Sequence, residues 1–335
     1  MFVCFVGWYL QYQTLNNVKC RENPNSSVYC KLSISHQITK YLTPIRDIKI
    51  SDDGKTLITA TEKEVVAWDI VTEIKKQSIK FNTQGYAVRT IAVAPDNLVA
   101  IGDTNDNSIK MWRTDKNTQT LVKTQHSDGI FNLAVSPNGK ILVSAGGTDG
   151  LVQVWSLETG KLKYNLKRNH TTFFLINDSY VNQVKISPDG KILVTINGGE
   201  INLWNLNNGD FISALSDTVD PLTSTLVISP DSKWLAVSGG KIWDLKTGNM
   251  KKSLGNILTE VISIAFLPNK LYVIGIQKTS NKSDVGKFLN IWNVETGELE
   301  FSQPTYGSIL AVAPDGKTII AASSTWGNPI EVWSY

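Results

Sequence analysis

Residues 130–166 read IFNLAVSPNGKILVSAGGTDGLVQVWSLETGKLKYNL. Four short runs within this stretch (130–136, 141–146, 151–157 and 162–166) are rich in Val, Ile, Leu and aromatic residues, and the turn residues of PNGK, TDG and ETGK separate them. The stretch therefore predicts four short antiparallel strands joined by tight turns. A sheet of roughly forty residues cannot bury both of its faces alone, so it must pack against others.

The same pattern recurs along the chain. A turn resembling PNGK occurs seven times: SDDGK (51–55), APDN (94–97), SPNGK (136–140), SPDGK (187–191), SPDSK (229–233), LPNK (267–270) and APDGK (313–317). Each turn is followed by a tryptophan: Trp68, Trp112, Trp155, Trp204, Trp243, Trp292 and Trp333. Successive tryptophans lie 39 to 49 residues apart. Seven sheets packed face to face around an axis would bury the faces that one sheet leaves open.

The wording of these repeats, SPDGK…ILV…DG…VWSLETG, resembles the WD-repeat propellers, and the turns resemble those of bacterial members. The Trp-Asp pair itself occurs at 68–69 and 243–244. The resemblance implies an all-β fold: a single seven-bladed β-propeller over residues 28–335, with four-stranded antiparallel blades, after an N-terminal tail (1–27) of uncertain structure. It also implies a non-catalytic scaffold or adaptor that binds a protein or peptide partner on its top face.

The chain ends two residues after the last tryptophan, where a fourth strand of the seventh blade would still be needed. An additional apolar run, VYCKLSI, occupies residues 28–34 ahead of the first complete set of strands. We expect this N-terminal run to complete the last blade and close the ring, which would remove the open sheet edges.

Charge and composition point away from several classes of function. The formal net charge of +3 arises within residues 1–40, so the remainder is neutral and offers little for nucleic acid to bind. All three cysteines lie in the first thirty residues, without the spacing of a zinc site. The apolar run 2–10 is too short to span a membrane and lacks the features of a secretory signal. A buried strand, a misassigned start and a degenerate anchoring segment all remain open for it; a cytoplasmic address is the default expectation.

A Ser, a His and an Asp occur together in the third repeat, as Ser144, His126 and Asp149. They invite comparison with a hydrolase triad. Their spacing to Trp155 instead resembles the buried hydrogen-bond network of WD repeats, so we expect a structural role and no catalytic residue. No metal site and no cofactor are expected either, since His36 and His170 lie in other repeats.

The candidate binding residues come from the top face that the resemblance implies. The residue six positions before each turn marker should lie near the central opening, which selects Arg46, Arg89, Phe131, Asn182, Ser224, Ile262 and Ser308. Two arginines beside a phenylalanine have the composition of a binding hot spot. Two loops add the aromatic candidates Phe173, Phe174, Tyr180 and Trp326.

Two other functions stay open. The chain could be an enzyme or small-ligand binder that uses the central channel, which would require carboxylates or histidines converging there. It could also be the regulatory end of a longer polypeptide. We expect a monomer, because a closed ring is complete by itself.

Overall fold

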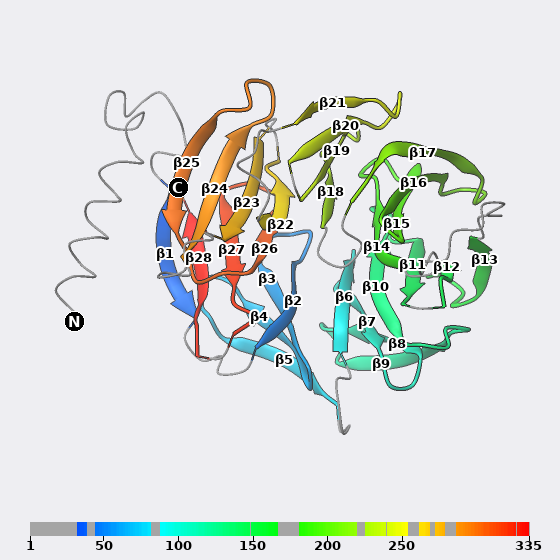
Figure 1. Cartoon of the computed structure of the whole chain (residues 1–335). Helices are drawn as coiled ribbons and strands as arrows, with labels where there is room; N and C mark the ends of the chain where they lie inside the picture. The colour runs from blue at the N-terminus through cyan, green and yellow to red at the C-terminus, as the bar shows by residue number, and fades with distance from the viewer. Residues whose placement is uncertain are drawn as a thin grey trace, which may run out of the picture.

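The structure is a computed structural model that describes residues 32–38, 44–81, 88–147, 149–166, 181–219, 225–238, 240–253, 261–268, 272–278, 286–325 and 327–334. Within these ranges the chain forms 28 strands and no helix. The strands pair into seven four-stranded antiparallel sheets, the blades, which follow one another around a ring (Figure 1). The predicted seven-bladed propeller is confirmed.

Blades I to III each use four consecutive strands. Blade I contains β2 (Ile45–Ile50), β3 (Thr56–Thr61), β4 (Glu64–Asp69) and β5 (Lys75–Lys80). Blade II contains β6 (Val88–Ala94), β7 (Leu98–Asp103), β8 (Ser108–Arg113) and β9 (Thr118–Lys123). Blade III contains β10 (Ile130–Val135), β11 (Ile141–Gly146), β12 (Val152–Ser156) and β13 (Leu162–Leu166).

Blades IV to VI follow the same order. Blade IV contains β14 (Val181–Ile186), β15 (Ile192–Asn197), β16 (Glu200–Asn205) and β17 (Phe211–Thr218). Blade V contains β18 (Leu226–Ile228), β19 (Trp234–Val237), β20 (Lys241–Asp244) and β21 (Met250–Ser253). Blade VI contains β22 (Val261–Phe266), β23 (Tyr272–Lys278), β24 (Lys287–Asn293) and β25 (Leu299–Pro304).

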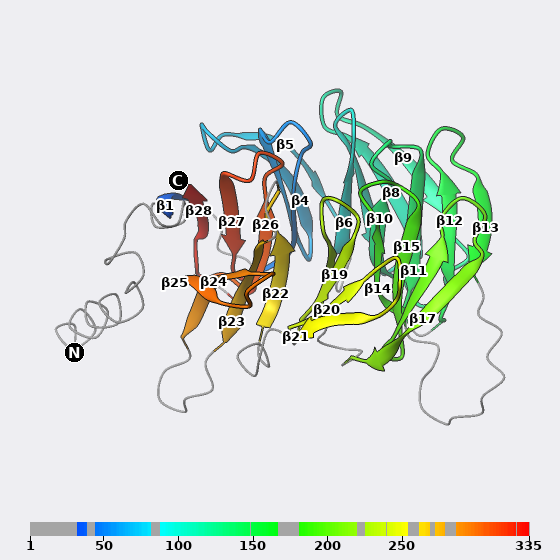
Figure 2. The ribbon, with the colours of Figure 1, turned by 90° about the horizontal axis from the view of Figure 1, so that it is seen from above.

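Blade VII closes the ring with strands from both ends of the chain. It contains β26 (Ile309–Val312), β27 (Thr318–Ala322) and β28 (Ile330–Ser334), and its outer strand is β1 (Ser33–Ile38). β1 lies beside β28 in both views (Figures 1 and 2), with Ser33 opposite Ser334 and Ile38 opposite Ile330. Closure by an N-terminal strand is therefore confirmed.

The closing strand lies further along the chain than we expected. The apolar run 28–34 was chosen for its hydrophobicity, whereas the strand covers SISHQI. An outermost strand covers little of the core, so apolar content does not mark it; Ser33, Ile34, Ser35 and Gln37 are exposed, and Ile38 is buried. Residues 28–31 lie outside the described ranges.

The hydrophobic core lies between neighbouring blades rather than within each one. One cluster joins Ile48 and Trp68 of blade I to Ile320 and Val332 of blade VII. The next cluster joins Val65 of blade I to residues of blade II, including its marker tryptophan. Each sheet thus buries its faces against the two adjacent sheets, which is how seven small sheets become one stable unit.

The recurring SPDGK turn follows from its side chains. In blade IV the Ser187 hydroxyl donates to Asp189 Oδ1 at 2.6 Å and accepts the backbone N–H of Ile192 at 2.9 Å. Asp189 Oδ1 also accepts the N–H of Lys191 at 3.1 Å. Gly190 takes a φ of +72°, a conformation that side chains resist. The motif therefore closes the tight connection between the first and second strands of a blade.

Candidate functional site

The first strands of all seven blades surround the axis and line a cavity of about 1020 Å³. Six of the seven predicted mouth residues line it: Arg46, Arg89, Phe131, Asn182, Ile262 and Ser308. The seventh, Ser224, lies outside the described ranges, as do Phe173, Phe174, Tyr180, Trp326 and His170. The residues six positions before the turns therefore come from six blades and lie around one opening.

A local irregularity explains why these residues reach the opening. In β2 the pairing with β3 moves from Ile45 directly to Asp47, so Arg46 is an extra residue in the register. The same bulge occurs at the start of four other first strands, with Arg89, Phe131, Asn182 and Ile262 as the extra residues. A bulge bends the strand and changes the direction of its side chain. Spacing from the turn located these residues, but the bulge was not predicted.

Arg89 and Phe131 form the most organised pair at this opening. The guanidinium carbon of Arg89 lies 3.9 Å from the centre of the Phe131 ring, in a cation–π contact. Phe131 in turn covers Gly147, where an added Cβ would lie 2.6 Å from the ring. The glycine therefore makes room for the ring, and the ring positions the cation. Arg46 forms an exposed ion pair with Glu62.

Cations outnumber carboxylates around the cavity. Its lining includes Arg46, Lys49, Arg89 and Lys185, against the carboxylates of Asp47 and Asp128. No histidine is among the described lining residues. Enzymatic use of the channel would require converging carboxylates or histidines, and the described lining offers no such convergence. Among the described residues, no group of three or more His, Cys, Asp and Glu side chains could hold a metal ion.

The first strands also connect neighbouring blades next to the cavity. Asp47 Oδ2 accepts the N–H of Ile91 at 3.0 Å, which links blade I to blade II. Asn132 Oδ1 accepts the N–H of Val184 at 3.2 Å, which links blade III to blade IV. Asp47 directly follows the bulge residue Arg46, and Asn132 directly follows Phe131. On each of these two strands, a residue at the mouth is therefore followed by one that connects neighbouring blades.

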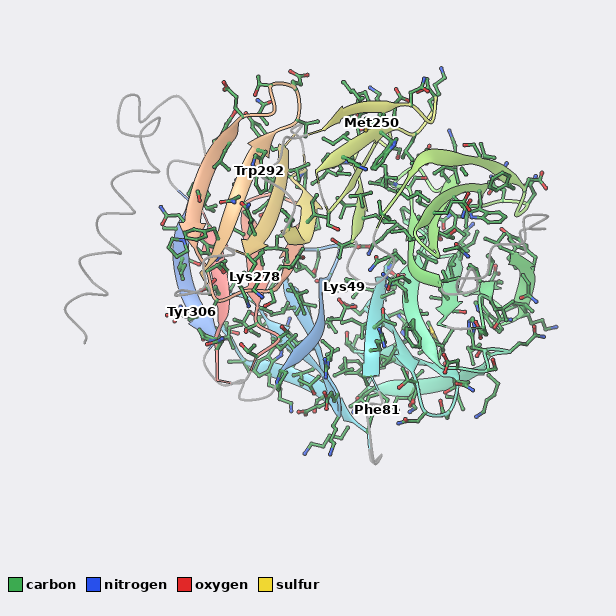
Figure 3. The ribbon with its side chains drawn as sticks, in the orientation of Figure 1. Lys49, Phe81, Met250, Lys278, Trp292 and Tyr306 are labelled. Carbon is green, nitrogen blue, oxygen red and sulfur yellow. The ribbon has the colours of Figure 1, made fainter. Side chains whose placement is uncertain are left out.

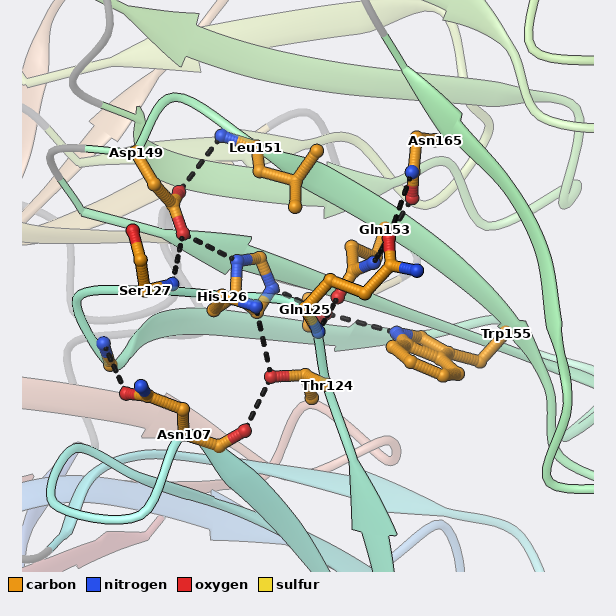
Figure 4. A network of polar contacts seen from close by, with 12 residues as sticks. Asn107, Thr124, Gln125, His126, Ser127, Asp149, Leu151, Gln153, Trp155 and Asn165 are labelled. Carbon is orange, nitrogen blue, oxygen red and sulfur yellow. Dashed lines mark hydrogen bonds and ion pairs between the residues drawn. The ribbon is translucent and has the colours of Figure 1, made fainter.

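The four residues His126, Ser144, Asp149 and Trp155 meet in blade III (Figure 4). Trp155 Nε1 donates to Ser144 Oγ at 3.0 Å. Ser144 Oγ and His126 Nε2 are 2.9 Å apart, and His126 Nδ1 and Asp149 Oδ2 are 3.1 Å apart. One arrangement satisfies every group: Ser144 donates to Nε2, and Nδ1–H donates to Asp149.

This network leaves its serine without access to a substrate. Ser144 has no exposed surface, and both Trp155 and His126 contact its hydroxyl. Burial raises the pKa of Asp149, but hydrogen bonds from His126 and from the backbone amides of Leu151 and Ser127 hold it below its ordinary value of 3.8. The ionised carboxylate of Asp149 orients the imidazole of His126, so each polar group of this structural network has a hydrogen-bond partner.

Two lysines further along the first strands were missed from the sequence. Lys49 follows Arg46 by three residues, and Lys185 follows Asn182 by the same distance. Burial, with repulsion from Lys49, lowers the pKa of Lys185 to about 8, although Asp47 acts in the opposite direction. The signal was present in the sequence, because the corresponding positions of the other five blades are alanine or valine.

The chain is a seven-bladed β-propeller with four-stranded blades, and tryptophans at equivalent positions pack between neighbouring blades. Residues 117–156 match the family described as WD domain, G-beta repeat. The described residues include no helix long and apolar enough to cross a membrane.

Animal proteins are among its relatives. The small ribosomal subunit protein RACK1 of Drosophila melanogaster is 34% identical over 152 residues, which are 43% of this chain and 43% of that protein. The protein of the same name from Caenorhabditis elegans is 32% identical over 150 residues, 43% of this chain and 42% of that protein. Apoptotic protease-activating factor 1 of Rattus norvegicus is 24% identical over 266 residues, 75% of this chain but 20% of that protein. The matches span less than half the length of each relative, and the bacterial resemblance stays a prediction.

Proposed function

We propose that this protein is a non-catalytic scaffold that binds a protein or peptide partner at the mouth of its central cavity. The observation that carries the proposal is the set of bulge residues that line the mouth, in particular the Arg89–Phe131 pair. Arginine and aromatic side chains dominate the energy of protein interfaces. The pair is also held in place before a partner arrives, which lowers the entropic cost of binding.

The names of the relatives also support a role in protein binding. One kind is described as a protein of the small ribosomal subunit and another as a factor that activates a protease. Both descriptions concern action on or within protein assemblies. We also propose that the protein acts as a monomer in the cytoplasm. The aromatic loop residues Phe173, Phe174, Tyr180 and Trp326 are proposed as further contacts to the partner.

The test is affinity capture from native lysate with three forms of the chain. The mouth variant changes Arg46, Arg89 and Phe131 to Ala. The matched control changes Val71, Lys116 and Lys161 to Ala; these residues lie in turns between third and fourth strands, on the opposite face from the mouth. All three forms should first be shown to melt alike.

We expect a partner that wild type and control capture and the mouth variant loses. Reciprocal capture with the purified partner then checks that binding is direct. A partner that the mouth variant retains at wild-type levels would contradict binding at the mouth of the cavity. The loop aromatics would then be the next candidates for the binding surface.

A further inference from the structure

One register position of the first strands contributes Lys49, Lys185 and Val227 to the cavity lining below its mouth. Pairing with the second strands places the following residues at equivalent positions in blades I to VII: Lys49, Ala92, Ala134, Lys185, Val227, Ala265 and Ala311. Five are small and apolar, and two are lysines that both line the cavity. Blades I and IV lie across the ring from each other, and Lys49 lies toward its middle (Figure 3). The two ammonium groups therefore face one space from opposite sides.

Only one of these lysines has its charge matched. Lys49 Nζ donates to Asp47 Oδ1 at 2.5 Å and to the carbonyl of Ile48 at 3.1 Å. Asp47 Oδ2 is already used by the N–H of Ile91. Both carboxylate oxygens of Asp47 thus already accept hydrogen bonds from groups other than Lys185.

The side chain of Lys185 makes no hydrogen bond or ion pair with any described residue, although its backbone pairs with β15. Its charged neighbours are Lys49 and Asp47, both on β2, and the other charged residues lining the cavity are Arg46, Arg89 and Asp128. A partly desolvated ammonium beside a second cation is unfavourable unless an anion accompanies it. The lowered pKa of Lys185 agrees with such an unmatched charge.

We propose that the central cavity binds a small, multiply charged oxyanion of the sulfate or phosphate type between Lys49 and Lys185. Both lysines can donate hydrogen bonds to such an oxygen group, and a cation at each side suits a dianion. Lys185 follows the mouth residue Asn182 by three residues, a depth of roughly 10 Å at the rise of a β-strand. That depth favours a free small molecule over an acidic side chain presented by a protein on the surface.

The test measures sulfate binding to the full chain by calorimetry, because the charge of sulfate does not change between pH 6 and 9. Wild type should bind at pH 7, and Lys185→Met should bind roughly tenfold to a hundredfold more weakly, as expected for the loss of a charged hydrogen bond. The control is Lys233→Met, which removes an exposed lysine outside the cavity; it should bind like wild type.

The pH dependence provides a readout that a purely structural lysine would not alter. Wild-type affinity should fall as the pH rises through about 8, where Lys185 loses its proton. Lys185→Arg keeps its charge throughout this range, so its affinity should change less. No sulfate binding by wild type, or equal binding by Lys185→Met, would overturn the proposal.

A hexaglutamate peptide distinguishes the source of the anionic group. Binding of the peptide that depends on Lys185, without binding of sulfate, would overturn the small-molecule assignment and give the cavity to an acidic segment of a protein. Capture of a partner at the mouth is independent of this site, and Lys185→Met should leave it unchanged. The two proposals can therefore fail separately.

Discussion

Blades III and V bury the same side chain at the same position but treat its polar atom differently. Trp155 in blade III donates its Nε1–H to Ser144, the next residue but one after its cross-strand neighbour Leu142. In blade V the equivalent position holds Val237, and Trp243 Nε1 has no partner among the described residues. Trp243 has no exposed surface, so its Nε1–H is not in contact with bulk solvent.

In two other blades a hydroxyl at this position supplies the acceptor, and the blades without one differ in what they do instead. Thr59 and Thr195 accept from the tryptophans of blades I and IV at 3.0 and 3.1 Å. Blade VI has Gly275 there, and its Trp292 Nε1 is without a partner among the described residues. Blades II and VII, with Ile101 and Ala321, find other acceptors for their tryptophans, on the side chains of Asn117 and Glu331. Among the described residues, two buried indole N–H groups thus have no acceptor, and leaving such a group unsatisfied costs about 1–3 kcal/mol.

The largest effect is expected where the network is most complete. Ser144→Ala removes the acceptor of Trp155 and the partner of His126 Nε2 in one step. We expect the free energy of unfolding in urea to fall by about 3 kcal/mol, since two buried polar groups lose their partner. Ser127→Ala is the control, because Ser127 is exposed and its contact with Asp149 uses the backbone N–H. A loss no larger than that of the control would mean that blade III gains nothing from its network.

Blade VI should resist repair. A Cβ at Gly275 would lie 3.0 Å from Val261 Cγ1 and 3.1 Å from the carbonyl of Ser263. We expect Gly275→Ser to lower the free energy of unfolding by about 2 kcal/mol, because overpacking outweighs the new hydroxyl near Trp292. Gly275→Ala, measured in the same denaturation series, separates the methyl group from the hydroxyl. Greater stability of Gly275→Ser than of wild type would show that the orphaned indole dominates instead.

Blades I and V permit a reciprocal exchange of nearly isosteric residues. Thr59→Val should destabilise by about 1.5 kcal/mol by removing the hydroxyl that accepts from Trp68 Nε1, while Val237→Thr should stabilise by about 1 kcal/mol by giving Trp243 an acceptor. Thermal melts of both variants and of the double variant measure the two changes. Changes of the same sign would refute the role assigned to this position.

The same comparison shows what could be predicted from the sequence. The turn and tryptophan markers predicted seven blades, because both elements report local chemistry that every repeat needs. The meeting of His126, Ser144, Asp149 and Trp155 followed from resemblance to one complete repeat. Lys49 and Lys185 are distinct in the sequence from the alanine or valine of the other blades, but that they meet in one cavity depends on a bulge that redirects each first strand and on which blades lie across the ring. The closing strand was placed too early, because exposed strands carry no apolar signal.

The smallest effect concerns the acid end of the blade III network, which blade V lacks. The pKa of Asp149 lies below its ordinary value in the folded chain, so its ionised form favours folding. This contribution is complete above pH 3.8, the ordinary value, and is lost as the pH falls through the lower folded value. Asp149→Asn does not titrate, so the stability advantage of wild type over this variant should be constant near neutrality and shrink below about pH 4. Urea denaturation of both proteins from pH 7 to pH 3 measures the gap. A gap that stays constant to pH 3 would show that His126 is oriented by shape and hydrogen bonding alone, without the charge of its partner.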